Sequence, residues 1–87
     1  MLSFTVITVC YNSAATIVDT LHSVAQQTYP HVEHIVIDGG SSDDTVALAR
    51  AHGRAGLVLV SEPDRGIYDA MNKGLRRATG DVVAFLT

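Results

Sequence analysis

The spacing of apolar residues along the chain switches repeatedly between two periods, and these periods predict the secondary structure. Residues 4–10, FTVITVC, are apolar or β-branched at odd and even positions alike, as expected for a strand covered on both faces. The period then becomes helical, with Ile17 and Leu21 on one apolar stripe. Residues 34–38, HIVID, and 57–61, LVLVS, repeat the pattern of a buried strand.

Polar residues before the helical stretches predict where the helices begin. Asn12 or Ser13 can cap the first helix. Ser41, followed three residues later by Asp44, matches a capping box that would open a second helix ending at about His52. Prolines and glycines supply the predicted stop signals, which are Pro30, Gly53 and Gly80.

The last third of the chain adds one helix and one strand. Four residues repeat there at helical spacing, namely Ile67, Met71, Leu75 and Ala78. Residues 81–87, DVVAFLT, then begin a fourth strand. The order β-α-β-α-β-α-β with short connections implies right-handed crossovers and a parallel sheet between layers of helices. The fold class is therefore α/β, a Rossmann-like three-layer α/β/α arrangement with a mostly parallel sheet, in one domain over residues 1–87.

Composition limits the partners and the location. The net charge of −3 and the pI near 5.6 argue against a protein that binds nucleic acid or an acidic membrane, because such proteins are normally basic. The single Cys10 cannot form an internal disulfide. No apolar run approaches the roughly 20 residues of a membrane span. We therefore expect a cytoplasmic protein, either free or at the cytoplasmic face of the membrane.

An acidic loop follows the second predicted strand. In open parallel sheets ligands bind beyond the carboxyl ends of the strands, and Asp38 occupies such a position. Its carboxylate could accept hydrogen bonds from a base N–H or a ribose hydroxyl, or it could shape the turn through Asx hydrogen bonds; the residues leave both open. Asp43 and Asp44 stand at the start of the next helix, where carboxylates favour the helix dipole, and we interpret them as structural caps.

A second polar cluster lies in residues 62–74, EPDRGIYDAMNKG. Asp69 and Lys73 are four residues apart on the predicted helix, which is typical of a solvated ion pair. Asn72 and Gly74 both lower helix propensity. We expect Gly74 to let the helix approach the sheet closely, whereas Asn72 has no evident structural role.

Several other kinds of site are not indicated. The GxGxxG and Walker-lysine patterns are absent, although the glycines of residues 39–40 and the following helix start could face a phosphate. Cys10 has no evident partner and is interpreted as buried packing. The histidines show no metal-ligand spacing; they are His22, His31, His34 and His52.

Three stretches together resemble the amino-terminal part of the family 2 glycosyltransferases with the GT-A fold. They are SFTVITVCYN, VIDGGSSDDT and SEPDRGIYDAMNKGLRRATGDVVAFL, in that order, and the resemblance runs the length of the chain. These sequence motifs resemble most those of bacterial members that build surface polysaccharides. The resemblance implies the strand order 3-2-1-4, a nucleotide-sugar donor, usually a UDP-sugar, and a saccharide or lipid-linked acceptor. It also implies transfer of a hexosyl-type sugar with inversion at the anomeric carbon.

The same resemblance assigns roles in donor binding. The end of the first strand lines the base and ribose, and Asp38 matches the acid that faces the nucleoside. Many relatives carry a second acid where this chain has Gly39. The segment that borders the ribose and the diphosphate is matched by Asp64 and Arg65, with Asp69, Asn72 and Lys73. The expected donor-binding residues are Thr8, Cys10, Tyr11, Asn12, Asp38, Gly39, Asp64, Arg65, Asp69, Asn72 and Lys73.

In the family, the strand that corresponds to residues 82–86 leads into an acidic DxD-type motif. That motif holds Mn²⁺ or Mg²⁺ against the diphosphate, and the catalytic base follows later. Because this sequence reaches only Thr87, we expect a nucleotide-binding part, cut before the metal ligands and without a catalytic residue, that transfers no sugar by itself. Its cut sheet edge at residues 82–86 is expected to favour self-association.

Two other hypotheses share the α/β order of elements. The first is a non-catalytic α/β binding or assembly module with the same architecture. The second is a flavodoxin-like or receiver domain in which Asp38 would be the phosphate acceptor. The order and spacing of the remaining residues do not fit that second hypothesis.

Overall fold

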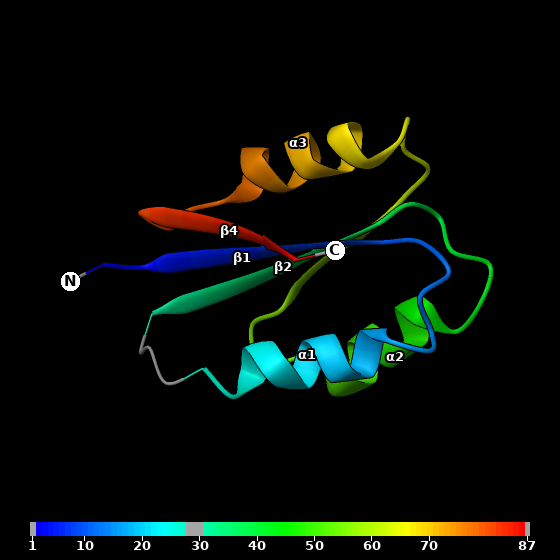
Figure 1. Ribbon diagram of the computed structural model, residues 1–87, viewed down its shortest axis with the longest axis horizontal. Coiled ribbons are helices and arrows are strands. Elements are labelled where there is room, and N and C mark those ends of the chain that lie inside the picture. The colour runs from blue at the N-terminus through cyan, green and yellow to red at the C-terminus, as the bar shows by residue number, and fades with distance from the viewer. Residues whose placement is uncertain (1, 28–30, 87) are drawn as a thin grey trace.

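A four-stranded parallel sheet forms the centre of the computed structural model, which describes residues 2–27 and 31–86 (Figure 1). The order β3-β2-β1-β4 confirms the predicted order 3-2-1-4 and the α/β fold class. The strands are β1 (Phe4–Cys10), β2 (Val32–Asp38), β3 (Val58–Ser61) and β4 (Val82–Leu86).

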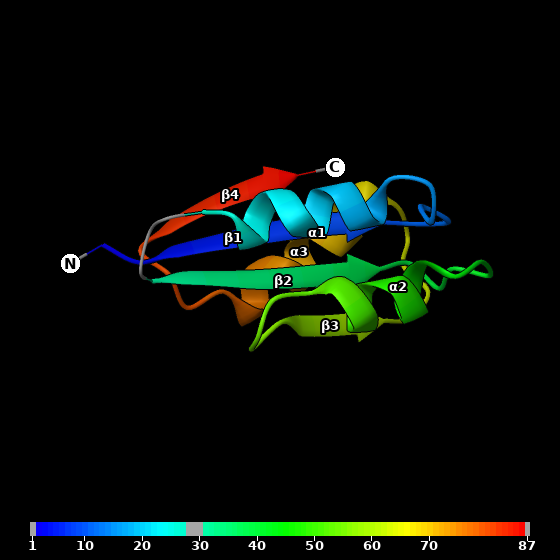
Figure 2. The ribbon, with the colours of Figure 1, turned by 90° about the horizontal axis from the view of Figure 1, so that it is seen from below.

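Helices cover both faces of the sheet and complete the three layers. The helices α1 (Ile17–Ala25) and α2 (Thr45–His52) lie side by side on one face, and α3 (Ile67–Arg77) lies on the other (Figures 1 and 2). No helix within the described ranges is long and apolar enough to cross a membrane.

The core consists of two apolar layers, one on each side of the central strands. This arrangement explains why β1 and β2 carry apolar residues at both odd and even positions. On the α3 side the buried residues are Ile7, Ile35, Ile37 and Ala70. On the α1 and α2 side they are Ile17, Leu21, Val36 and Ala49.

Gly74 confirms the close approach predicted for the third helix. A Cβ atom at Gly74 would lie 2.5 Å from Cγ2 of Ile7, so only glycine lets α3 pack this tightly on β1. The helix ends at Arg77. Ala78, the last residue of the predicted helical repeat, is its C-cap residue and has an extended backbone.

The predicted start of the first helix is wrong. We expected Asn12 or Ser13 to cap it, but α1 begins at Ile17, with Thr16 as the N-cap residue. A separate turn precedes the helix, in which the N–H groups of Thr16 and Ile17 donate to the carbonyl of Ser13 at 3.0 and 2.8 Å. The predicted stop at Pro30 and the last strand residue, Thr87, lie outside the described residues.

The capping box predicted for the second helix is also wrong. The helix α2 begins at Thr45, and Asp44 precedes it without a side-chain cap hydrogen bond. The hydroxyl of Ser41 donates instead to the carboxylate of Asp38. Asp43 supports the helix start, because its Oδ1 accepts a hydrogen bond from the N–H of Thr45 at 3.0 Å. The predicted end at His52, followed by Gly53, is confirmed.

Candidate functional site

The carboxyl ends of β1, β2 and β3 bring three loops together at one end of the sheet, the right-hand end in Figure 1. Two backbone hydrogen bonds continue the strand pairing into these loops. The N–H of Gly39 donates to the carbonyl of Cys10 at 2.9 Å, and the N–H of Glu62 donates to the carbonyl of Asp38 at 3.0 Å. The polar stretches that follow the three strands in sequence are therefore neighbours in space.

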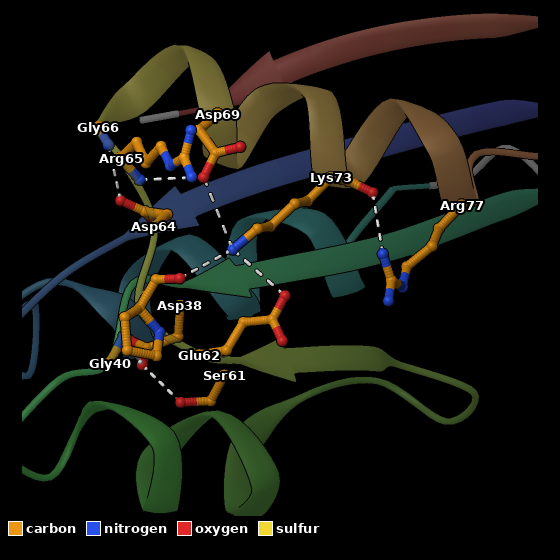
Figure 3. Close-up of polar contacts among 11 residues, drawn as sticks. Asp38, Gly40, Ser61, Glu62, Asp64, Arg65, Gly66, Asp69, Lys73 and Arg77 are labelled. Carbon is orange, nitrogen blue, oxygen red and sulfur yellow. Dashed lines mark hydrogen bonds and ion pairs between the residues drawn. The ribbon is translucent and has the colours of Figure 1, made fainter.

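Asp38 is completely buried, and protein groups hold both of its carboxylate oxygens, among them Ser61 from the end of β3 (Figure 3). Its Oδ2 accepts hydrogen bonds from the N–H of Gly40 at 3.1 Å, the N–H of Ser41 at 2.9 Å and the hydroxyl of Ser61 at 2.8 Å. Its Oδ1 accepts one from the hydroxyl of Ser41. Burial raises the pKa of Asp38, but these hydrogen bonds outweigh it and hold the pKa below its ordinary value. Asp38 is thus an ionised anchor for residues 39–41.

Asn12 links the loop after β1 to the loop after β2. Its backbone has a left-handed φ of 48°, a conformation that asparagine tolerates better than most residues. Its Oδ1 accepts hydrogen bonds from the N–H groups of Ser42 at 2.8 Å and Asp43 at 3.4 Å, and its own N–H donates to Ser41 Oγ at 2.8 Å. The two loops consequently form one hydrogen-bonded unit.

A cavity of about 330 Å³ opens between the end of β1 and the start of α3. Three of the predicted donor-binding residues line it, which are Cys10, Tyr11 and Asp64. Tyr11 is 61% exposed. Val9 also lines the cavity and belongs to the strand end, residues 8–12, that the resemblance assigns to the base and ribose. The sequence analysis missed the other lining residues, Gly66, Ile67 and Ala70. The large apolar Ile67, beside the polar EPDRG stretch, was the only signal that could have indicated them.

Asp64 lies directly against Gly39. A Cβ atom at Gly39 would be 2.7 Å from Oδ2 of Asp64, closer than real side-chain contacts allow. The other oxygen, Oδ1, accepts a hydrogen bond from the N–H of Gly66 at 3.0 Å (Figure 3). The structure therefore brings together two predicted site residues that are 25 positions apart in the sequence.

Lys73 holds the segment before α3 in place. Its Nζ donates to the carbonyl of Pro63 at 3.0 Å and lies 3.2 Å from Glu62 Oε1 and 3.7 Å from Asp69 Oδ2 (Figure 3). The pairing with Asp69 is confirmed, but the expectation of a solvated pair is wrong, because the Lys73 side chain is only 12% exposed. The N–H of Arg65, which donates to Asp69 at 2.9 Å, is the largest influence on the pKa of Asp69 and holds it below its ordinary value.

Three of the other predicted residues, Thr8, Arg65 and Asn72, lie outside the cavity lining. Thr8 is buried, with its Oγ1 hydrogen-bonded to Nε2 of His34 at 2.8 Å. Arg65 and Asn72 are exposed. Cys10, which lines the cavity, packs against the α1 and α2 layer. The expectation that it has no partner is wrong, because its thiol donates a hydrogen bond to Asp38 Oδ1 at 3.6 Å. Burial, followed by the charge of Asp38, raises the pKa of the thiol to about 12. The thiol therefore stays protonated at neutral pH, which agrees with a packing role.

Residues 2–27 and 31–86 contain no group of three or more histidine, cysteine, aspartate or glutamate side chains that could hold a metal ion. The resemblance places the metal ligands after residue 87, so we assign no chemical step to a metal here.

Comparison with protein families gives a match to the family described as "Glycosyl transferase family 2" over residues 5–87. An uncharacterized glycosyltransferase of Mycobacterium tuberculosis is 46% identical over 82 residues, which cover 93% of this chain and 31% of that protein. The putative teichuronic acid biosynthesis glycosyltransferase TuaG of Bacillus subtilis is 40% identical over 84 residues, covering 93% of this chain and 33% of that protein. The chain thus spans about a third of the length of these relatives.

Solved structures show the same arrangement of strands and helices. The mannosyltransferase of Pyrobaculum calidifontis, in complex with GDP-Man and Mn²⁺, has a TM-score of 0.84 at 35% identity over 94% of this chain and 26% of that one. Residues 1–349 of S. aureus TarS, in complex with UDP-GlcNAc, have a TM-score of 0.85 at 33% identity over 98% of this chain and 26% of that one. Glucosyl-3-phosphoglycerate synthase of M. tuberculosis, with Mn²⁺ and UDP, has a TM-score of 0.82 at 31% identity over 98% of this chain and 33% of that one.

Proposed function

Because the chain belongs to glycosyl transferase family 2, we propose that residues 1–87 form the amino-terminal, nucleotide-binding part of a glycosyltransferase domain. The proposed donor is a UDP-sugar. Support comes from two of the solved relatives, which bind UDP-GlcNAc or UDP, although a third binds GDP-Man. The proposed acceptor is a saccharide or a lipid-linked saccharide of the cell envelope, in keeping with the teichuronic acid relative.

The proposed reaction is transfer of a hexosyl group with inversion. A bond forms between an acceptor hydroxyl oxygen and the anomeric carbon while the bond from that carbon to the nucleoside diphosphate breaks. The residues described here bind and orient the donor. They hold the loops in position before the donor arrives, which lowers the entropic cost of ordering the site.

The observation that carries this proposal is the cavity between Tyr11 and Asp64 at the carboxyl end of the sheet. The half-exposed ring of Tyr11 can stack on a nucleobase, which is worth about 1–3 kcal/mol per base in other proteins. Asp64 supplies a hydrogen-bond acceptor for the nucleoside. The interactions of Asp38 and Lys73 fix the two loops that border the cavity.

Calorimetric titration with UDP, GDP and dTDP, with and without Mn²⁺, tests this function. We expect UDP to bind more tightly than GDP, and Tyr11→Ala to weaken UDP binding by about tenfold or more. Asp19→Asn is the matched control, because Asp19 is exposed on α1, away from the cavity. The proposal fails if no nucleoside diphosphate binds, or if Tyr11→Ala and Asp19→Asn bind UDP as the parent does.

A further inference from the structure

We propose that Gly39 and Asp64 act as one specificity-determining pair, in which Asp64, rather than Asp38, supplies the carboxylate that contacts the donor nucleoside. The carboxylate of Asp64 occupies the space that a side chain at position 39 would fill, so a larger residue there would displace that carboxylate. The inference rests on the proposed nucleotide binding and deepens it.

The need for glycine at position 39 is steric and not conformational. The glycines with a left-handed backbone are Gly40, Gly56 and Gly66, so Gly39 is not among them. Its backbone is therefore open to other residues. The obstacle is Asp64, whose Oδ2, Cγ and Oδ1 would lie 2.7, 3.3 and 3.5 Å from a Cβ atom at Gly39. All three atoms nearest to that position belong to one carboxyl group.

Asp64 is held at one oxygen and available at the other. The N–H of Gly66 donates to Oδ1 at 3.0 Å, which fixes the carboxyl group against the start of α3. In the part of the chain that the structure describes, no group donates a hydrogen bond to Oδ2. The side chain is partly exposed and lines the cavity beside Tyr11. It is a positioned acceptor whose second oxygen can receive a ligand's hydrogen bond.

Asp38 is in the opposite situation. It has no exposed surface, and Gly40, Ser41 and Ser61 supply the donors to its oxygens. A ligand could reach Asp38 only by displacing one of these groups, because Asp38 has no exposed surface. The residue that the sequence marked as the nucleoside acid is thus the loop anchor, and the accessible carboxylate is at Asp64.

The charge of Asp64 selects the end of the ligand that it contacts. A carboxylate accepts hydrogen bonds and repels phosphate, so it suits a ribose hydroxyl or a base N–H and not the diphosphate. We place the nucleoside of the donor against Asp64, with the diphosphate directed away from it. The two possible hydrogen-bond donors are distinguished by comparing UDP with 2′-deoxy-UDP.

An exchange of the carboxylate between the two positions gives a direct test. Gly39→Asp places a second carboxylate in the space that Asp64 occupies. Asp64→Gly removes the carboxylate that lines the cavity. Each single change should therefore weaken UDP binding by about tenfold or more. The double variant Gly39→Asp/Asp64→Gly should recover affinity to within about threefold of the parent, because the two positions share one space. Asp19→Asn serves as the carboxylate control.

A second measurement follows the pair without ligand. In ¹H–¹⁵N spectra, Gly39→Ala should move the Gly66 amide resonance in the same direction as Asp64→Ala does, because both changes disturb its hydrogen bond. If the parent binds no nucleoside diphosphate, this inference and the proposed function fall together. If the parent binds UDP and Gly39→Ala leaves both the affinity and the Gly66 resonance unchanged, this inference alone is wrong. A double variant no better than the weaker single one also overturns it.

Discussion

Acidification should destabilise the fold through one buried imidazole. His34 lies on β2 with 1% of its surface exposed, and its Nε2 is hydrogen-bonded to Oγ1 of Thr8 at 2.8 Å. Its Nδ1 is buried without a partner among the described residues. Burial, helped by the nearby positive charge of Arg54, lowers the pKa of His34 from 6.5 to about 4.

The expected loss of stability follows from this difference in pKa. Between about pH 6.5 and pH 4 the unfolded chain binds a proton at residue 34 that the folded chain excludes. The free energy of unfolding is therefore highest above pH 6.5 and decreases as the pH falls toward 4. At 1.36 kcal/mol per pKa unit, the decrease is about 3 kcal/mol. This is a large part of the 5–15 kcal/mol typical of a domain.

Urea denaturation followed by circular dichroism at pH 7.5, 6.0 and 4.5 measures this decrease. His34→Gln, which cannot titrate, should remove most of the slope, whereas His31→Gln, a change at an exposed histidine, should keep it. An NMR titration of the parent locates the pKa of His34 directly. An unfolding free energy that is the same at pH 7.5 and 4.5, or an equal slope in His34→Gln, would refute the reasoning.

Three further predictions concern the loops and the sheet edge. In urea denaturation, Asp43→Ala should lower the free energy of unfolding more than Asp44→Ala does. The effect of Asp44→Ala, through the helix dipole, should be about 0.5 kcal/mol or less. A larger loss in Asp44→Ala than in Asp43→Ala would contradict the observed contacts. Lys73→Met should speed amide exchange in residues 62–66 and weaken UDP binding by about tenfold, while Arg77→Met on the same helix should not. The outer edge of β4 should promote self-association of the 87-residue chain in sedimentation at micromolar concentration, and Phe85→Lys should reduce it; a parent that stays monomeric would refute this.

The fold was largely predictable, because it depends on patterns that are local in the sequence. The continuous apolar runs at 4–10 and 34–38 match strands buried on both faces, and the observed sheet order agrees with the predicted one. The helix starts were not predictable from local signals. The N–H of Asn12 donates to Ser41, 29 residues away, and the hydroxyl of Ser41 turns to Asp38, so neither residue is available to cap a helix. Tertiary hydrogen bonds replaced the local caps.

The candidate site was predictable in its position but not in the roles of its residues. The rule that ligands bind beyond the carboxyl ends of strands predicted that Asp38, Asp64 and Tyr11 lie together, and the structure brings them to one end of the sheet. Sequence could not show that Ser61, from the next strand, would complete the set of donors around Asp38. It also could not show that the carboxylate of Asp64 lies against Gly39, since that contact depends on how the two loops meet.

The strand order also constrains the time course of folding. The pairing of β1 with β2 joins residues such as Thr5 and Glu33, 28 positions apart, whereas the junction of β1 with β4 joins Ser3 and Asp81, 78 positions apart. Contacts this distant are slow to form because a long loop must close first. On the ribosome, β1, β2 and β3 are therefore able to pair while β1 is still a sheet edge. The edge of β1 that pairs with β4 is completed only after residues 82–86 have emerged.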